Sequence, residues 1–354
     1  MFEVQDFRFD LIVKMIGPSI QQLSGKTLLW TGTNGFLGKW VVGLVGYLNE
    51  HVLTIRCKLI AIDMEIPSAE IVAAYEPLNI EFRAHDLATK LGLVEEKIDF
   101  VVHMAGIASP YHYERRPLET IDVALEGIRS TLEIAKHSGS KFLFTSSSEV
   151  YQTATVIPTP ETYVGAIASN NARSCYDVSK LMGENLAYVY KTQFGVNTVI
   201  TRIFNSFGPG ISESDYRIVP RIASSLVGGQ ALSVFATGNQ PTRTYCPTGN
   251  TIAGLLLALL NGKSGEIYNV GCDKPEVTIL ELLEIIQDQL GCKVPYKVVE
   301  PTAVYIDEPK RRCPDISKAR DQLGYNPEIS LEQGLELFFN WALPRYKGQV
   351  ARDY

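Results

Sequence analysis

The sequence has few of the features that mark metalloproteins, disulfide-rich secreted proteins or nucleic-acid-binding proteins. Its 354 residues include only six cysteines, and no two of them form a C-x-x-C pair. Because this scatter fits neither a zinc site nor a small disulfide framework, we expect reduced thiols and no bound metal. The net charge of −6 and the lack of a long basic run argue against a nucleic-acid partner.

Long hydrophobic runs are missing as well. The apolar run Ile252–Leu260 is far shorter than a membrane-spanning helix. The N-terminus, MFEVQDFRFD, mixes acids with apolar residues and has no basic region, so it is not a signal peptide. Internal repeats are also absent. We therefore expect a cytoplasmic protein that does not act at a membrane.

The sequence is organised around one glycine-rich turn. The apolar run Thr27–Trp30 leads into TGTNGFLG, and an apolar-rich segment, Trp40–Leu48, follows. The glycines of this turn are Gly32, Gly35 and Gly38. In a strand–turn–helix unit, such glycines allow a tight turn, close approach of the backbone to a pyrophosphate, and close packing of helix on strand. The N–H groups at the start of the helix then face the phosphates.

From Lys26 onward, short apolar runs alternate with helical patterns. The runs are Thr27–Trp30, Leu59–Ile62, Phe100–His103, Lys141–Thr145 and Asn197–Ile203. This alternation predicts an α/β fold, a doubly wound Rossmann sheet of parallel strands with helices on both faces. Ligands of such sheets bind beyond the carboxyl ends of the strands. Asp63 ends the second run, where a ribose-binding carboxylate belongs.

The pattern changes on both sides of this region. Residues 1–24 place apolar side chains at helical spacing as far as Gly17-Pro18, which predicts an amphipathic helix that covers either the sheet or another subunit. After residue 205, breaker clusters separate the helical patterns. We therefore expect an N-terminal helical extension (1–24), a dinucleotide-binding Rossmann domain (25–205) and a smaller C-terminal α/β substrate-binding lobe (206–354), partly interleaved with the Rossmann domain.

A tyrosine and a lysine four residues apart open the helical pattern at Asp177–Thr192. Tyr176 and Lys180 share one helix face, so the hydroxyl and the ammonium can point into one site. Free tyrosine has a pKa near ~10, and a neighbouring cation lowers it toward the range of a usable base. The alternative is a surface pair on an amphipathic helix. The segment Ser146–Glu149 ends another predicted strand and adds hydroxyl groups and a carboxylate.

Several of these segments occur together in an order that resembles a known superfamily. They are TGTNGFLG, HMAGIASP, SSSEVY, YDVSK, RIFNSFGPG, NQPTR and DEPKRRCPD. Their order is similar to that of the extended short-chain dehydrogenases/reductases, the NAD-dependent epimerases and dehydratases, and more narrowly to UDP-glucuronate decarboxylases (UDP-xylose synthases). The resemblance covers roughly residues 26–340. It implies a bound NAD that oxidises a sugar at C4 and later returns the hydride, a nucleotide-sugar substrate, and a homodimer.

The resemblance also implies roles for individual residues. Tyr176 would be the base at the C4 hydroxyl, Lys180 would bind the nicotinamide ribose and lower the tyrosine pKa, and Ser147 would bond the C4 oxygen. Ser148 and Glu149 match the decarboxylases, whereas 4,6-dehydratases carry Asp-Glu there. The implied cofactor contacts are Gly32, Asn34, Gly35, Phe36, Leu37, Gly38, Asp63, Asp86, Leu87, Ala105, Tyr176, Lys180 and Ile203. The implied substrate contacts are Ser109, Asn205, Arg243 and Arg312.

The charge of Asp63 favours NAD over NADP, because it repels a 2′-phosphate. Other positions depart from the decarboxylase pattern. Pro241 is inserted into the usual Q-T-R segment, Pro247–Asn250 replaces Y-V-S-D, Gly210 replaces a common Arg, and Ala124 replaces a common Asn. The first three changes are expected near the sugar nucleotide, so they leave the substrate open.

Three alternatives to a nucleotide-sugar decarboxylase stay open at this stage. They are a nucleotide-sugar 4-epimerase, a 4,6-dehydratase and a redox-sensing NAD binder without chemistry. A simple binder would have little need of Tyr176, Lys180 and Ser147 together. We therefore expect an enzyme that acts through a 4-keto sugar, with decarboxylation as the leading reaction.

Overall fold

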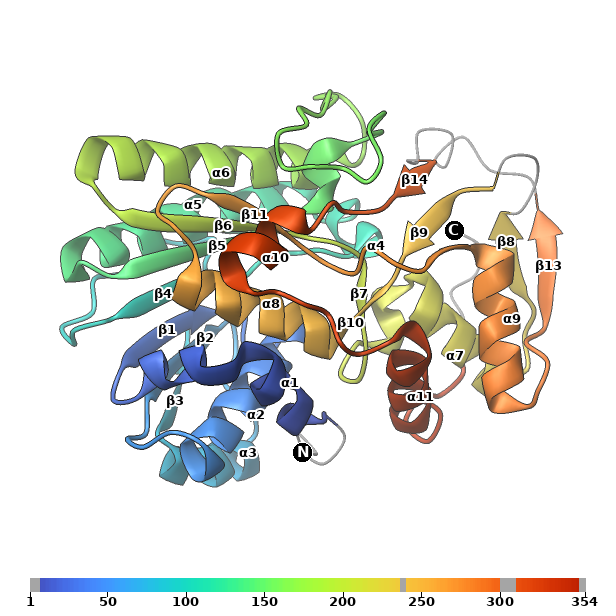
Figure 1. Ribbon diagram of the computed structural model, residues 1–354, viewed down its shortest axis with the longest axis horizontal. Coiled ribbons are helices and arrows are strands. Elements are labelled where there is room, and N and C mark those ends of the chain that lie inside the picture. The colour runs from blue at the N-terminus through green and yellow to red at the C-terminus, as the bar shows by residue number, and fades with distance from the viewer. Residues whose placement is uncertain (1–6, 236–239, 300–309, 350–354) are drawn as a thin grey trace.

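A parallel sheet of seven strands forms the centre of the protein (Figure 1). The computed structural model describes residues 7–235, 240–299 and 310–349. The strand order is β11-β6-β5-β4-β1-β2-β3. The strands are β1 (Thr27–Thr31), β2 (Lys58–Asp63), β3 (Ile80–Ala84), β4 (Phe100–His103), β5 (Lys141–Ser147), β6 (Asn197–Ile203) and β11 (Ile267–Val270). The predicted Rossmann α/β class is confirmed.

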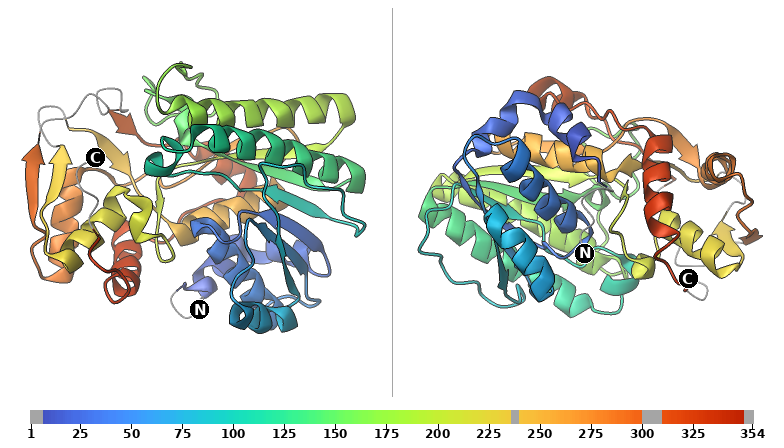
Figure 2. Two further views of the ribbon diagram at one scale, coloured as in Figure 1. Left: turned by 180° about the vertical axis from the view of Figure 1, so that it is seen from behind. Right: turned by 90° about the horizontal axis from the view of Figure 1, so that it is seen from below.

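Helices cover both faces of this sheet (Figure 2). On one face lie α5 (Pro117–Ser138) and α6 (Ser174–Phe194), and on the other lie α2 (Phe36–His51) and α8 (Thr248–Asn261). Neighbouring residues of β1 point to opposite faces: Leu28 is buried in the core under α2 and α8, and Leu29 in the core under α5 and α6. Burial on both faces explains why the central strands form continuous apolar runs in the sequence.

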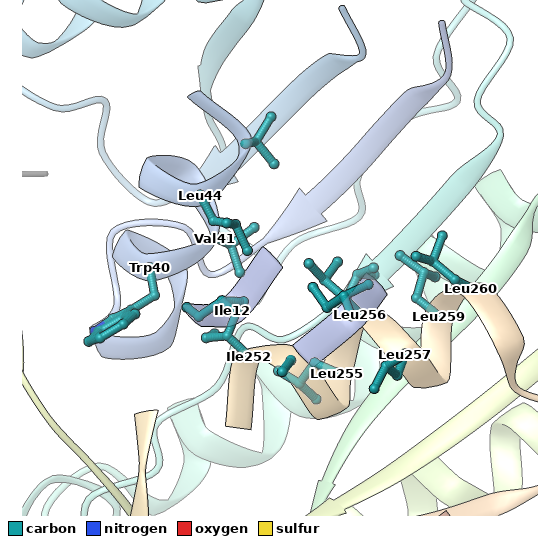
Figure 3. Packing of buried hydrophobic residues seen from close by; sticks show 14 of the residues in the cluster. Ile12, Trp40, Val41, Leu44, Ile252, Leu255, Leu256, Leu257, Leu259 and Leu260 are labelled. Carbon is teal, nitrogen blue, oxygen red and sulfur yellow. The ribbon is translucent and has the colours of Figure 1, made fainter. Parts of the chain in front are cut away.

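The N-terminal segment packs on the chain's own helices. Helix α1 (Phe9–Ile16) ends before Gly17-Pro18, and a 3₁₀ helix (Gly17–Leu23) follows. Figure 3 shows Ile12 between α2 and α8, beside Val41 and Ile252. The sequence left open whether the apolar side chains of this segment cover the sheet layers or another subunit. They cover the chain's own helices α2 and α8.

A smaller lobe lies beyond the carboxyl ends of the central strands (Figure 1). Its strands are β8 (Leu232–Phe235) paired with β13 (Tyr296–Val299), and β9 (Thr242–Thr244) between β12 (Glu276–Thr278) and β14 (Arg311–Arg312). Its core is formed by α7 (Ile218–Gly228), α9 (Ile279–Leu290) and α11 (Leu331–Ala342). The short strands β7 (Ser206–Phe207) and β10 (Cys246–Pro247) join the lobe to the sheet. The remaining helices are α3 (Ala69–Tyr75), α4 (Pro110–Tyr113) and α10 (Ser317–Leu323).

Two strands of the central sheet were not predicted. Strand β3 is an edge strand whose residues are mostly half-buried, and its sequence, IEFRA, has no apolar run. Strand β11 and helix α8 come from residues after 205, yet β11 pairs with β6 and α8 packs on the sheet. Residues 248–270 therefore return to the Rossmann layers. Over the described ranges, no helix has the length and hydropathy needed to cross a bilayer.

Candidate active site

The glycine-rich turn has the geometry that its sequence predicts. Gly32 has a φ of +79°, and a Cβ atom there would lie 2.8 Å from the backbone of Ala105. A Cβ atom on Gly38 would collide with the carbonyl oxygen of Gly32, so helix α2 can pack this closely only with glycine. At Gly35 a Cβ atom would meet only the Gly32 oxygen, at 3.2 Å. The backbone is therefore accessible in front of the turn.

The start of α2 fits the diphosphate of a dinucleotide. Its N-cap residue, Gly35, provides no side-chain cap, and the first turn contains no acidic residue. The N–H groups of this turn are thus left for an external acceptor. Asp63 accepts hydrogen bonds from the backbone N–H groups of Asn34 (2.8 Å) and Met64 (2.8 Å). These bonds fix its carboxylate beside the turn.

The other predicted cofactor residues also border the carboxyl edge of the sheet. Phe36 and Leu37 form the first turn of α2, and Ile203 ends β6. Asp86 follows β3, where its carboxylate accepts a hydrogen bond from the N–H of Ala88 (2.9 Å). The side chain of Leu87 is buried.

The structure brings Tyr176, Lys180 and Ser147 together at the end of β5. Tyr176 is buried, and its ring stacks on that of Tyr113 with 5.2 Å between the ring centroids. The Lys180 amine donates to the carbonyl of Thr145 (2.9 Å) and lies 5.6 Å from the centroid of the Tyr176 ring. The hydroxyl of Ser147 forms a hydrogen bond with Tyr176.

The expected lowering of the Tyr176 pKa is not found. Burial raises the pKa of Tyr176 to about 12, although the hydrogen bond with Ser147 opposes this rise. Burial also lowers the pKa of Lys180 to about 8. The prediction from the sequence was wrong on this point, because it counted the charge of the lysine and not the loss of water around the phenol.

A cluster of two arginines and one glutamate lies next to these residues. The carboxylate of Glu149 accepts hydrogen bonds from Arg173 (2.7 Å) and, through two nitrogens, from Arg312. Arg312 also donates to the Ser148 hydroxyl (3.2 Å). Burial alone would raise the pKa of Glu149, but the two guanidinium groups outweigh it and lower the pKa to about 2. The cluster therefore carries a net positive charge at neutral pH.

A second carboxyl group beside this cluster behaves differently. Burial, followed by the charge of Glu149, raises the pKa of Asp177 to about 7. The side chain of Gln152 donates a hydrogen bond to one oxygen of Asp177, and the other oxygen is buried without a hydrogen-bond partner among the described residues. Asp177 thus exchanges a proton near neutral pH, one residue away from Tyr176.

Three site residues were missed from the sequence. Arg173 precedes Tyr176 by a few residues, Tyr113 stacks on it, and Arg217 extends from the smaller lobe just before α7. The charge of Arg217 lowers the pKa of Tyr176, and its guanidinium lies 6.0 Å from the ring centroid of Phe36. Asp215 holds it with two hydrogen bonds, of 2.5 and 2.9 Å. No periodic pattern or motif marks these three residues.

The predicted substrate residues lie at the junction of the lobes, and most of them bond to the backbone. Asn205 donates its amide to the carbonyl of Thr244 (3.0 Å). The Ser109 hydroxyl donates to the carbonyl of Asp215 (2.8 Å). Arg243 donates to its neighbour's carbonyl and lies on β9, opposite Arg312 on β14.

One sequence departure has a structural explanation that we did not predict. Within Pro247–Asn250, Asn250 is fully buried and exchanges two hydrogen bonds with the backbone of Ile329 (2.8 and 3.0 Å). A Cβ atom on Gly249 would meet Ile329, and Ile12 of α1 lies 3.5 Å away. The segment therefore serves packing between α8, α11 and the N-terminal helix.

Over the ranges that the structure covers, no group of three or more His, Cys, Asp or Glu side chains is arranged to hold a metal ion. The six cysteines form no disulfide.

Comparisons with known proteins agree on one family. Residues 28–271 match the NAD dependent epimerase/dehydratase family. A protein named UDP-glucuronic acid decarboxylase 3, from Arabidopsis thaliana, is 37% identical over 259 residues, which cover 73% of each chain. The solved structure of a UDP-glucuronic acid 4-epimerase from Bacillus cereus, in complex with UDP-glucuronic acid and NAD, is 25% identical with a TM-score of 0.72, covering 90% of this chain and 100% of that one. DesIV, a dTDP-glucose 4,6-dehydratase from Streptomyces venezuelae with NAD and TYD bound, shares the fold at 23% identity and a TM-score of 0.75, covering 90% and 97%.

Proposed function

Because the chain belongs to the NAD dependent epimerase/dehydratase family, we propose that it decarboxylates a nucleotide-linked uronic acid of the UDP-glucuronate type through a transient 4-keto sugar. The observation that carries this proposal is the cluster of Glu149, Arg173 and Arg312 beside Ser147 and Tyr176. It is a net positive site at the carboxyl edge of the sheet, in which Arg312 is buried and Glu149 and Arg173 are half-buried. The names of the relatives that are about one-third identical support the same reaction.

The residues of the glycine-rich turn fit NAD. The first turn of α2 would bind the diphosphate, Asp63 the adenosine ribose, and Lys180 the nicotinamide ribose. Bound NAD supplies a hydride acceptor, and later a hydride donor, at the sugar C4 atom. The carboxylate of Asp63 disfavours the 2′-phosphate of NADP.

The chain's own side chains then handle the protons. Tyr176 takes the proton of the C4 hydroxyl, and Ser147 hydrogen-bonds the C4 oxygen. The guanidinium of Arg217 favours the phenolate, against the larger effect of burial, and Lys180 holds the nicotinamide ribose beside it. In the 4-keto sugar the C5 carboxylate is β to a carbonyl. When the bond from C5 to the carboxyl carbon breaks, CO₂ leaves and the electron pair moves onto the C4 oxygen, where the hydrogen-bond donors stabilise it.

The positive cluster gives the reaction its preference for an acidic sugar. Glu149 neutralises only one of the two guanidinium groups, so Arg312 and Arg173 together can attract a second carboxylate. Arg312 is suited to this role because its planar fork pairs two oxygens at once. We assign Ser109, Asn205 and Arg243 to the nucleotide and its phosphates, since they line the junction between the lobes.

The test is a panel of nucleotide sugars incubated with the protein and NAD, analysed by mass spectrometry. Loss of CO₂ from UDP-glucuronic acid is expected, and Tyr176→Phe should abolish it. If no uronic acid loses CO₂, the proposal is wrong. An unchanged mass with a changed sugar would then indicate 4-epimerisation, which the Bacillus cereus structure makes the second candidate. Loss of water would indicate a 4,6-dehydratase.

We also propose that two copies associate through α6 to form a homodimer. Its side chains Leu181, Met182 and Tyr188 are 44%, 43% and 62% exposed, which is unusual for a row of large apolar residues on one helix. Sedimentation should give a dimer, and Leu181→Lys with Tyr188→Lys should give a monomer. The free cysteines fit a reducing compartment, and we propose the cytoplasm.

A further inference from the structure

The segment Ile211–Arg217, called the lid here, connects the smaller lobe to the catalytic tyrosine. It ends in Arg217, whose charge acts on Tyr176 and whose guanidinium lies near Phe36 at the start of α2. Asp215 fixes that guanidinium from within the lid. The position of the lid therefore decides where Arg217 stands relative to the reacting sugar.

The Rossmann domain holds one side of the lid. The hydroxyl of Ser109 donates to the carbonyl of Asp215 (2.8 Å). The ring of Tyr216 packs edge-on against that of Tyr111, with 4.3 Å between centroids. Tyr216 has a φ of +60°, a left-handed conformation that is unfavourable for a residue with a side chain. Contacts on both sides keep the lid in this conformation.

Residues Tyr346–Gln349, called the C-terminal strap here, hold the other side. The Tyr346 hydroxyl donates to the carbonyl of Ile211 (3.0 Å). The carboxylate of Glu213 accepts hydrogen bonds from the backbone N–H groups of Lys347 (2.9 Å) and Gln349 (2.8 Å), and from Ser224 on α7 (2.6 Å). Glu213 is thus the common acceptor that joins lid, strap and helix.

The charge state of Glu213 agrees with this arrangement. Burial raises the pKa of Glu213, but the hydrogen bonds from Lys347, Ser224 and Gln349 outweigh burial and lower it. The carboxylate therefore stays ionised at neutral pH and keeps its full capacity as an acceptor. Behind it, the backbones of Gly228 and Gly348 lie so close that a side chain on either would collide with the other.

We propose that Glu213 and the C-terminal strap form a clasp that positions the lid, so that Glu213 is a positioning residue for substrate binding through Arg217. Its effect on substrate binding rests on the proposed nucleotide-sugar site, whereas its effect on the lid does not. Breaking the clasp should raise KM for the nucleotide sugar, and it should also lower kcat because Arg217 favours the Tyr176 phenolate. NAD affinity should change less than KM, because the hydrogen bonds that fix Asp63 are not affected.

Hydrogen exchange in the unliganded protein tests the clasp directly. The amides of Lys347 and Gln349 report on the strap, and the amide of Asp215, bonded to the Ser212 carbonyl (3.0 Å), reports on the lid. In Glu213→Gln these three amides should exchange at least about tenfold faster. A factor of about ten is what the loss of one hydrogen bond to a charged acceptor is expected to produce. Tyr346→Phe, which removes only a hydroxyl, should act in the same direction.

The matched control is Glu281→Gln. Glu281 also accepts a backbone hydrogen bond in the smaller lobe, but that bond belongs to the capping box at the start of α9 and not to the lid. It should change neither the exchange of Asp215 nor KM for UDP-glucuronic acid. Faster exchange at Lys347 and Gln349 with an unchanged Asp215 amide would overturn the proposal, as would unchanged KM in an active enzyme whose Asp215 amide exchanges faster. If the protein turns over no nucleotide sugar, the proposed function fails while the exchange data still decide on the clasp.

Discussion

Replacing Arg312 with alanine should slow CO₂ release from UDP-glucuronic acid much more than the same change at its neighbour Arg311. The side chain of Arg312 is only 6% exposed and pairs with Glu149, which is 19% exposed. Arg311 stands next to it on β14, but its side chain is 54% exposed and pairs with Glu276. Both variants therefore remove a guanidinium group from β14: Arg312→Ala removes it inside the site, and Arg311→Ala removes it at the surface.

The expected losses of rate differ by at least about sixfold between the two variants. Truncating one partner of a buried, hydrogen-bonded charge pair costs about 2–5 kcal/mol, much of it because the other charge is left unpaired. Since ~1.4 kcal/mol is a factor of ten, Arg312→Ala should lose at least roughly thirtyfold in rate. A surface pair is worth about 0–1 kcal/mol, so Arg311→Ala should lose about fivefold at most. Arg312→Lys should restore part of the loss, because it keeps the charge without the paired donors.

The assay measures CO₂ from UDP-glucuronic acid at saturating NAD, with NAD affinity measured separately by calorimetry. NAD affinity should be the same in wild type, Arg311→Ala and Arg312→Ala, since β14 belongs to the smaller lobe. Equal activity of the two alanine variants would refute the assignment of Arg312 to the reaction. A loss of NAD affinity in Arg312→Ala would instead indicate a general disturbance of the fold.

Further predictions follow from the same contacts. Tyr176→Phe should reduce turnover by about 10²–10⁴ while NAD still binds; activity above a tenth of wild type would exclude Tyr176 as the base. Calorimetry should show much weaker binding of NADP than of NAD, and Asp63→Ser should narrow that difference. Because the pKa of Glu149 is lowered from 4.5 to about 2, its contribution to stability is present above pH ~4.5 and should be lost as the pH falls toward ~2, visible in acid unfolding. Glu184→Gln should lower the unfolding free energy by about 3–5 kcal/mol, because it leaves the buried Arg202 without its charged partner.

The central part of the site was predictable because its geometry is local. The turn from Gly32 to Gly38 needs only a strand, a glycine spacing and a helix, and all of these are visible within one stretch of sequence. The spacing of Tyr176 and Lys180 fixes their common helix face in the same way. Their pKa values were not predictable, because the pKa of Tyr176 depends on burial under Tyr113, which comes from a distant segment.

The residues that surround this core could not be found from local pattern. Arg217 reaches the site only because the lid folds back onto Ser109, and Arg173 is defined only by its partner Glu149. Strand β11 was missed for a related reason. The position of β11 beside β6 is set by pairing between strands that are far apart in the sequence. In addition, β11 follows an apolar helix in the region after residue 205, where clusters of helix-breaking residues favoured a separate lobe.

The positions of the segments that match the decarboxylase pattern and of those that depart from it indicate how the reaction and the substrate preference are separated in this protein. Glu149 at the end of β5 and Arg312 on β14 join the two lobes through an ion pair. This pair fixes the groups proposed for decarboxylation, so sequence changes elsewhere in the smaller lobe leave them in place. Of the departures from the decarboxylase pattern, Pro241 precedes β9, and Gly210 immediately precedes the lid. A change at either position alters the junction between the lobes without touching Tyr176 or Glu149. Differences in the nucleotide or sugar accepted should therefore map to β9 and the lid, whereas loss of the reaction should map to the ends of β5 and β14.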